Sequence, residues 1–290
     1  MRILRRALLV IAAGAGLFIA WLFAVWPPPV WYATHFPNRT AFMAMRERSG
    51  VETVAYRPVP IDSITPLFAQ AVTLGEDNRF WSHSGLDFVE LRHAIGYRRD
   101  DFSFTSGRDL RDLARALGHV WSRRDDVRGA STITQQLAKN LYLSPSRNPL
   151  RKFKEAVTAY RLELALSKQR ILELYMNVVE LGPGIWGVDA ASEAYFHRPP
   201  SRLSRSEAAA LAGTLPFPLE SNPSFQPGRM RWRQGWILGR MGRGSTGAGR
   251  APSRGGPQTA PTRTIDDHRP ARPASCHPHH STRSSRMPNC

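Results

Sequence analysis

An uncharged stretch at the N-terminus constrains this chain most. Residues 7–26 carry no charged side chain, and Arg2, Arg5 and Arg6 precede them. As a helix rising about 1.5 Å per residue, this stretch spans about 30 Å, the thickness of the hydrocarbon core of a bilayer. A cleaved signal peptide is the alternative, but its apolar run is usually only ~7–15 residues long. Residues 1–26 are therefore predicted to be a single transmembrane anchor with a cytoplasmic N-terminus, because arginines precede the span.

The rest of the chain contains enough apolar side chains to fold. Hydrophobic residues make up 42% of the 290 positions, which excludes a wholly disordered protein. The formal net charge of +17 favours an anionic partner, such as nucleic acid, a phospholipid surface or a phosphorylated substrate. Both cysteines, Cys276 and Cys290, lie close to the C-terminus. A disulfide, a cysteine-ligated zinc or a cysteine nucleophile is therefore not expected in the folded core.

Beyond the anchor, the pattern is typical of one helical domain. Residues 27–60 contain several prolines and are predicted to form an exposed juxtamembrane arm. Within residues 61–242, capping residues and apolar periodicity predict helices, and no stretch alternates as a strand would. The expected fold class is therefore all-α. The expected helices cover residues 66–77, 88–97, 110–121, 132–142, 150–166, 167–179, 204–214 and 228–241.

Two segments depart from this pattern. Residues 98–128 are polar and rich in Arg and Asp, and they are predicted to be a mobile insertion around one short helix. Residues 243–290 are rich in Arg, Pro, Gly and Ser with few large apolar side chains, so they are predicted to form a disordered tail. Four of the nine histidines lie in this tail, and a metal-binding tract is the alternative that its composition leaves open.

One candidate for catalysis is a glutamate at a predicted helix end. Glu76 ends the helix that begins after Thr65, and aromatic residues, His83 and the turn residue Gly85 follow it. A partly desolvated carboxylate in such a place can act as a general base. An ordinary exposed glutamate at a surface helix end is the alternative, and spacing alone favours it.

A second candidate is a group of cations and amides on two successive helices. Gln136 and Lys139 share a helix face, with Gln135 and Asn140 beside them. On the next helix, Glu155 lies three and four positions after a lysine and an arginine, so these three side chains can converge. Such a set suits a sugar phosphate, because lysine and arginine both complement phosphate oxygens. A solvated, salt-bridged helix face is the alternative. No glycine-rich phosphate-binding loop is present, so ATP is not implied.

Taken in order, these motifs resemble those of the peptidoglycan glycosyltransferases, and most of all the monofunctional biosynthetic transglycosylases. The resemblance covers about residues 50–241. Its motifs are Glu76-Asp77-x-x-Phe80-x-x-His83-x-Gly85, the run GASTITQQLAKNL at 129–141, Arg151-Lys152-x-x-Glu155, the run ILELYMN at 171–177, Gly187-Val188-x-Ala190-Ala191 and Arg233-Gln234-x-Trp236-Ile237-Leu238.

The resemblance implies a lysozyme-like, two-lobed, all-α glycosyltransferase domain that polymerises lipid II into glycan strands. Glu76 would deprotonate the acceptor 4-hydroxyl, which attacks the donor anomeric carbon with inversion and expels undecaprenyl pyrophosphate. Glu155 is the second implied catalytic residue, near the donor diphosphate, where a divalent cation (Mg or Mn) is a further option; no cofactor is otherwise implied. The implied substrate-binding residues are Ser131, Thr132, Gln135, Gln136, Lys139, Asn140, Arg147, Arg151 and Lys152.

The chemistry of the leaving group favours this interpretation. Pyrophosphate leaves readily, so the enzyme needs charge neutralisation more than a strong acid. A lysozyme-like lytic enzyme, the first alternative, would instead need a carboxylic acid to protonate its leaving group. A non-enzymatic, basic, membrane-tethered binding protein is the second alternative. The chain has no Ser-x-x-Lys motif, so glycan polymerisation without peptide cross-linking is expected.

The expected location is the inner membrane of the cell, crossed once, with the catalytic domain in the periplasm. The expected partners are lipid II, the growing glycan strand, the membrane and other cell-wall synthesis proteins, and no nucleic-acid module is present.

Overall fold

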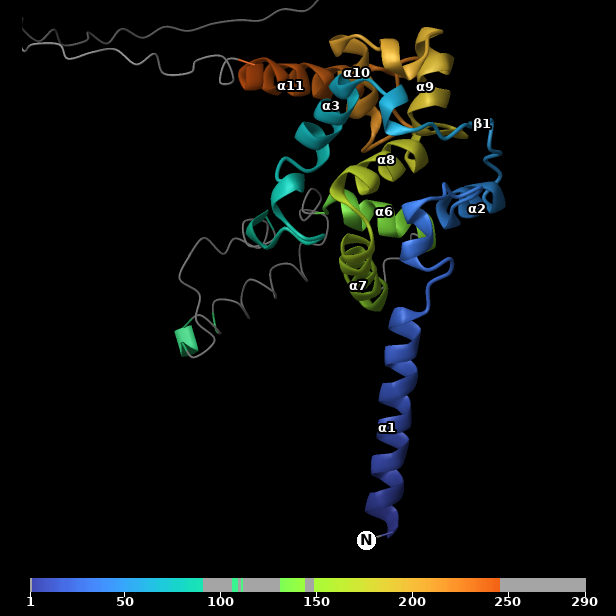
Figure 1. The fold of residues 1–290 in the computed structure, drawn as a ribbon, viewed down its shortest axis with the longest axis vertical. Helices are drawn as coiled ribbons and strands as arrows, with labels where there is room; N and C mark the ends of the chain where they lie inside the picture. Colours follow the sequence, from blue (N-terminus) through green and yellow to red (C-terminus); the bar gives the residue numbers. More distant parts are fainter. Residues whose placement is uncertain (1, 91–105, 109–110, 112–130, 144–148, 246–290) are drawn as a thin grey trace, which may run out of the picture. The chain divides into compact units, whose positions relative to one another are not determined.

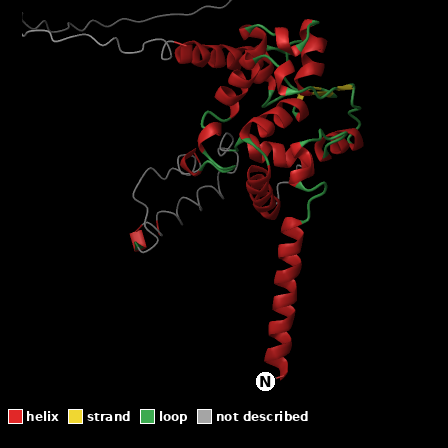
Figure 2. Ribbon diagram, in the orientation of Figure 1, coloured by secondary structure: helices red, strands yellow, loops and turns green. Residues whose placement is uncertain are grey.

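The computed structural model describes residues 2–90, 106–108, 111, 131–143 and 149–245. This part of the chain is mostly helical, with very short strands (Figure 2), so the predicted all-α class is confirmed. The α-helices are α1 Arg2–Phe23, α2 Ala41–Arg48, α3 Pro66–Glu76, α6 Ile133–Tyr142, α7 Pro149–Ala165, α8 Lys168–Val178, α9 Gly187–Phe196, α10 Arg205–Thr214 and α11 Gly228–Ser245 (Figure 1). Single-turn 3-10 helices occur at Pro29–Ala33, Ile61–Ser63, Phe80–Ser82 and Pro200–Arg202.

The helices after the anchor pack in two groups. In one group α6 contacts α2, α7 and α8, and in the other α3, α10 and α11 contact one another. Helix α9 touches both α8 and α10 and so links the groups. One continuous core joins them, to which Phe68, Leu137, Leu172 and Leu211 contribute fully buried side chains. The site described below lies where the end of α3 meets α6 and α11.

Capping side chains set the helix starts as the sequence predicts. Thr65 accepts from the amide of Leu67 ahead of the proline that opens α3. The capping box of Thr132 and Gln135 opens α6. A second capping box opens α10, and a serine caps α8 in the same way. Because these side chains satisfy amides that have no partner inside the helix, the starts of these four helices agree with prediction to within one residue.

The arm and the sheet differ from expectation. Residues 41–48 form α2, which packs on α6 and buries Met43, so the prediction of an exposed arm is wrong there. A three-stranded sheet in the order β1-β3-β2 joins β1 Ala55–Tyr56, β2 Glu180–Gly182 and β3 Ile185–Trp186, with β1 parallel and β2 antiparallel to β3. Strands of two or three residues are too short to show period-two alternation.

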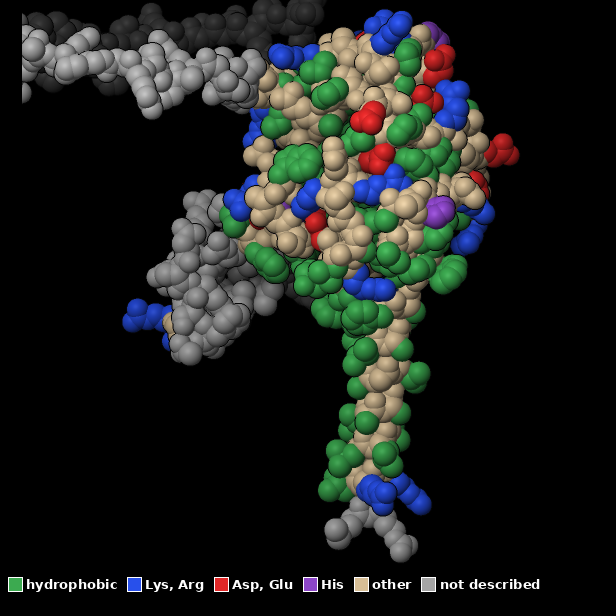
Figure 3. All heavy atoms as spheres, in the orientation of Figure 1, with side chains coloured by type: hydrophobic (Ala, Val, Ile, Leu, Met, Phe, Trp, Pro, Cys, Tyr) green, Lys and Arg blue, Asp and Glu red, His purple; other side chains and the backbone are tan. Residues whose placement is uncertain are grey.

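Helix α1 meets the domain beside α7. Among the described residues, α1 is the one helix long and apolar enough to cross a membrane, and Figure 3 shows hydrophobic side chains along it with cations at its N-terminal end. Lys154 donates to the carbonyl of Ala24 at 3.0 Å, and Arg161 donates to that of Phe23 at 2.8 Å. Both carbonyls lie at the end of α1, where a helix has no partners of its own for them. The two α7 cations therefore cap the anchor.

Several predicted segments lie outside the described residues. Only residues 88–90 of the predicted helix 88–97 are described, and they are helical. Of the predicted insertion 98–128, only residues 106–108 and 111 are described. Arg147 lies outside the described residues. By its contacts the chain divides into the units Met1–Gly249 and Arg250–Cys290. The second unit is not described, so the predicted tail 243–290 stays a prediction, although α11 continues to Ser245.

Candidate active site

The carboxylate of Glu76 lies at the C-terminal end of α3 and is held by two other helices. Its side chain is 10% exposed. Arg233 of α11 donates to Oε1 at 2.6 Å and also to the carbonyl of Gly75 at 2.6 Å. Gln136 of α6 donates from Nε2 to Oε2 at 3.0 Å. Each carboxylate oxygen keeps a lone pair after these bonds, so Glu76 can still accept a proton.

A buried tyrosine orients the glutamine that holds Glu76. The hydroxyl of Tyr175, on α8, donates to Oε1 of Gln136 at 2.8 Å. Burial raises the pKa of Tyr175 well above its ordinary value, and the nearby Glu76 charge acts in the same direction. The hydroxyl therefore stays protonated and available as a donor. With its oxygen taken by Tyr175, the Gln136 amide must turn its nitrogen toward Glu76.

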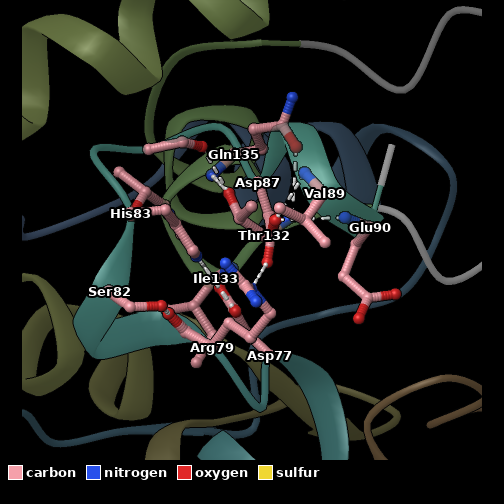
Figure 4. A network of polar contacts seen from close by, with 12 residues as sticks. Asp77, Arg79, Ser82, His83, Asp87, Val89, Glu90, Thr132, Ile133 and Gln135 are labelled. Carbon is pink, nitrogen blue, oxygen red and sulfur yellow. Dashed lines mark hydrogen bonds and ion pairs between the residues drawn. The ribbon is translucent and has the colours of Figure 1, made fainter. Parts of the chain in front are cut away.

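The loop after Glu76 is tied to the start of α6 by a buried polar network (Figure 4). The amide of Ile133, the first residue of α6, donates to Oδ2 of Asp77 at 3.0 Å. His83 contacts the same carboxylate at 3.0 Å through Nε2. The hydroxyl of Thr132 donates to the carbonyl of Gly85 at 2.6 Å, and Gly85 has a φ of +87°, which suits glycine. These bonds fix the end of α3 against α6, so that Glu76 and Gln136 meet.

The same network contains the one group of described residues that could approach a metal ion. Ligand atoms of Asp77, His83 and Asp87 lie within 4.8 Å of one another. The carboxylates already have partners, however: Asp77 accepts from the amide of Ile133, and Asp87 accepts from two backbone amides and from Arg79 at 2.9 Å. We therefore assign the cluster a structural role.

Glu76 and Gln136, which share a hydrogen bond, each line a separate hollow. The first, of about 220 Å³, is lined by Glu76; the second, of about 180 Å³, is lined by Gln136. The other residues that line the first hollow are Leu74, Gly75, Asp77, Asn78, Asp87, Glu90, Ser131, Thr132, Trp236 and Arg240. The other residues that line the second are Phe42, Arg46, Lys139, Asn140, Tyr175, Val179, Glu180, Leu215, Pro216 and Pro218.

Lys139 provides a cation without a bonded counterion. It lines the second hollow, and no described residue accepts a hydrogen bond or forms an ion pair with its Nζ, which lies 5.6 Å from the Phe42 ring centroid. Desolvation lowers the pKa of Lys139 below its ordinary value, while the charges of Glu155 and Glu76 oppose that shift. Lys139 thus feels the charge of both glutamates and is suited to receive an anion.

Glu155 organises the cations at the start of α7. Its side chain is 3% exposed; Arg151 donates to Oε2 at 2.7 Å, and Lys152 donates to Oε1. Lys152 also donates to the hydroxyl of Ser131 at 2.8 Å, which connects α7 to the segment before α6. The predicted convergence of these three α7 residues is therefore confirmed. Both oxygens of Glu155 already accept bonds from cations, and this arrangement does not fit a divalent metal ion.

Known proteins resemble this chain in sequence over most of its length. A family model described as Transglycosylase matches residues 97–242. The chain is 36% identical to a protein of Bordetella pertussis over 245 residues, which cover 83% of this chain and 93% of that protein. It is 39% identical to one of an Azoarcus species over 246 residues (81% and 96%) and 38% identical to one of Escherichia coli O17:K52:H18 over 246 residues (83% and 88%). All three are named biosynthetic peptidoglycan transglycosylase.

The chain belongs to the transglycosylase family. Membership confirms the lysozyme-like helical fold that the resemblance implies, and it confirms that the protein is a glycosyltransferase enzyme. The family match begins after Glu76, so the role of that residue rests on its own geometry and on its motif.

The residues predicted from sequence to bind substrate lie in different parts of the transglycosylase site. Ser131 and Thr132 line the first hollow, and Lys139, Asn140 and Gln136 line the second. Gln135 lines neither of these two, because its buried side chain accepts from the Thr132 amide at 3.0 Å in the capping box. Arg147 lies outside the described residues.

Two residues that hold the Glu76–Gln136 pair were not among the predicted site residues. Arg233 and Tyr175 hold the Glu76–Gln136 pair, yet they received no role from sequence. Both lie inside motifs of the resemblance, so a signal existed. Their partners are 157 and 39 positions away, and spacing along one helix cannot reveal contacts at such separations.

Proposed function

We propose that this peptidoglycan transglycosylase polymerises lipid II into glycan strands. One observation carries the proposal: a held carboxylate, Glu76, lines one hollow, and Lys139, a half-buried lysine with no bonded counterion among the described residues, lines a second. The relatives that it resembles are named for peptidoglycan biosynthesis. The proposal joins a base for an acceptor hydroxyl to cations for a phosphorylated leaving group.

Glu76 acts as the general base. It takes the proton of the acceptor 4-hydroxyl, and the oxygen attacks the donor anomeric carbon from the side opposite the diphosphate. The new carbon–oxygen bond forms as the bond to the diphosphate breaks, and undecaprenyl pyrophosphate leaves with the electron pair. Arg233 and Gln136 hold the carboxylate in one orientation throughout. Reorienting the carboxylate therefore adds nothing to the activation free energy.

The cations around Lys139 bind the departing diphosphate. A partly desolvated lysine without a bonded counterion is stabilised by an incoming anion, because the anion compensates for the hydration that the ammonium group has lost. Arg151 and Lys152 add donors that suit phosphate oxygens. Glu155 acts through them as a positioning residue, since both of its oxygens already hold these cations. No step requires a metal ion at Glu155.

The membrane anchor places this site next to a lipid-linked substrate. Helix α1 crosses the inner membrane, with its N-terminal arginines in the cytoplasm and the domain in the periplasm. Helix α7, which contacts α1, exposes Leu150, Phe153 and Leu164. These side chains continue the apolar surface of the anchor onto the domain, which is what an enzyme with a substrate dissolved in the bilayer requires.

The substitution Glu76→Gln tests the proposal in the full-length protein with purified lipid II. We expect glycan polymer from the wild type and none from the variant, with lipid II binding and melting temperature retained, because Gln cannot accept the proton. Glu220→Gln is the matched control, because Glu220 also pairs with an arginine of α11, at 2.6 Å, but is 69% exposed. Soluble muropeptides from preformed peptidoglycan, without polymer from lipid II, would instead identify a lytic enzyme.

A further inference from the structure

Trp236 is the one aromatic side chain among those lining the hollow that holds Glu76 in the described part of the chain. It lies on α11 and is 40% exposed, so a large part of its ring faces open space. The proposed reaction gives this ring no role. An indole next to a catalytic carboxylate is a chemically distinctive surface, because its apolar face can receive the C–H face of a sugar ring.

Two arginines fix the indole against the end of α3. The guanidinium of Arg240 lies 4.2 Å from the centroid of the Trp236 ring, and that of Arg233 lies 5.9 Å away. Arg240 also donates to the carbonyl of Leu74 at 3.2 Å, and Arg233 holds Glu76 itself. The ring and the base therefore share a common support, and the position of one is tied to the position of the other.

The opposite flank of the indole is open at two glycines. With successive helical residues about 100° apart, Arg233 and Arg240 lie on one side of Trp236, and Gly235 and Gly239 lie on the other. A Cβ atom built on either glycine would meet nothing within 4 Å. The two glycines therefore leave room on that flank, where Trp232 lies one turn before the ring.

We propose that the indole of Trp236 stacks on the pyranose ring of the acceptor sugar and holds its 4-hydroxyl toward Glu76. This assignment rests on the proposed function and adds a binding residue to it. The stacked ring fixes the tilt of the sugar, and the carboxylate in the same hollow receives the proton. Trp236 is then a determinant of acceptor affinity, separate from the cations that bind the donor diphosphate.

Steady-state polymerisation of lipid II by the full-length protein tests the assignment. Loss of one stacked ring raises KM by about tenfold for Trp236→Ala, with a smaller change in kcat, and Trp236→Phe recovers most of the affinity. Trp232→Ala is the matched control: Trp232 lies one turn away on the same helix, is 73% exposed and lines neither hollow. An unchanged KM in Trp236→Ala, or an equal rise in Trp232→Ala, overturns the assignment.

A second variant fills the open flank while leaving the indole in place. Gly239→Leu favours the helix, because leucine is a better helix former than glycine, and its side chain leans toward the N-terminal turn that carries Trp236. We expect unchanged or raised thermal stability with a KM raised as in Trp236→Ala; wild-type KM for Gly239→Leu contradicts an approach from that flank.

Binding without turnover separates this assignment from the proposed function. The probe is a soluble tetrasaccharide of alternating N-acetylglucosamine and N-acetylmuramic acid, measured by calorimetry. Binding that Trp236→Ala weakens supports the assignment even if the wild type makes no polymer. Polymer formation with equal tetrasaccharide binding by the wild type and Trp236→Ala leaves the function standing and removes the role of Trp236.

Discussion

Tyr175 supports Glu76, the proposed general base, through one intervening side chain. Without its hydroxyl, Oε1 of Gln136 loses its partner and the amide is free to turn away from Glu76. We expect Tyr175→Phe to lower kcat by about tenfold and to cost about 1–3 kcal/mol of stability, the usual loss for a buried polar group left unpaired. Polymerisation kinetics and thermal unfolding measure the two effects.

Tyr142→Phe is the control for this experiment. The hydroxyl of Tyr142 is also buried but has no hydrogen-bond partner in the described structure, so its removal leaves kcat unchanged. Equal losses in the two variants would mean that the hydroxyl of Tyr175 acts through packing rather than through Gln136.

Lys139 gives the reaction an alkaline limit. Its pKa is lowered by desolvation from the ordinary 10.5, so its charge disappears at a lower pH than that of an exposed lysine. The deprotonated amine no longer attracts the diphosphate, and kcat/KM should therefore fall as the pH rises toward that lowered pKa. Arginine stays charged over this range. The variant Lys139→Arg should therefore have a lower kcat/KM at neutral pH, and this value should persist to a higher pH than in the wild type. Profiles from about pH 7 to 10 that coincide in shape would contradict this role.

The sequence could predict a role for Glu76 but not for Arg233, which holds its carboxylate. The glutamate stood out only within an ordered motif, because a carboxylate at a helix end is common on protein surfaces. Its partner Arg233 is 157 positions away, and only the packing of α11 on α3 brings the two together. Lys139 was predicted as a phosphate ligand, but its lack of a bonded counterion depends on what surrounds it in the fold.

At the scale of elements, the start of α7 acts as a unit held by Glu155. The substitution Glu155→Gln leaves Arg151 and Lys152 without their shared counterion, so these cations become less ordered and KM for lipid II should rise with a smaller change in kcat. Because both oxygens of Glu155 are already bonded to cations, we expect a chelator to leave wild-type polymerisation unchanged. Activity lost to the chelator and restored by Mg²⁺ or Mn²⁺ would show that a metal ion is required.

Helices that combine a capping side chain with an apolar stripe were predicted well, whereas α2, α9 and the strands were not. The starts of α6, α8 and α10 could be predicted from Thr132, Ser167 and Ser204. The side-chain oxygens of these residues accept hydrogen bonds from backbone amides that have no partner within the helix. Helix α9 begins after Trp186 without a side-chain cap, and α2 follows Thr40 but lacks a clear apolar stripe. Strands β1 to β3 exist only because residues far apart in sequence pair, which a local pattern cannot show.

At the scale of the whole chain, the unit Met1–Gly249 holds every residue of the proposed site. Removing residues 250–290 should therefore change neither the melting temperature nor the rate of polymerisation. Truncation after residue 242 is a stricter test, because α11 continues to Ser245 and loses its last residues. An inactive protein truncated after Gly249 would show that the C-terminal unit contributes to catalysis.

In the proposed reaction, the two cations that cap α1 also tie the diphosphate site to the end of the anchor. Lys154 bonds the end of the anchor, and Lys152, which binds beside the diphosphate in the proposed reaction, is only two residues earlier on the same helix. Two helical residues correspond to a rise of about 3 Å along α7, so the two lysines leave opposite sides of the helix at almost the same point along its axis. The phosphates of a lipid carrier lie in the headgroup layer, at the level where α1 leaves the hydrocarbon. In the proposed reaction we therefore expect a carrier to react without being lifted out of its leaflet, so that the sugar chain lengthens while its lipid tail stays dissolved in the bilayer.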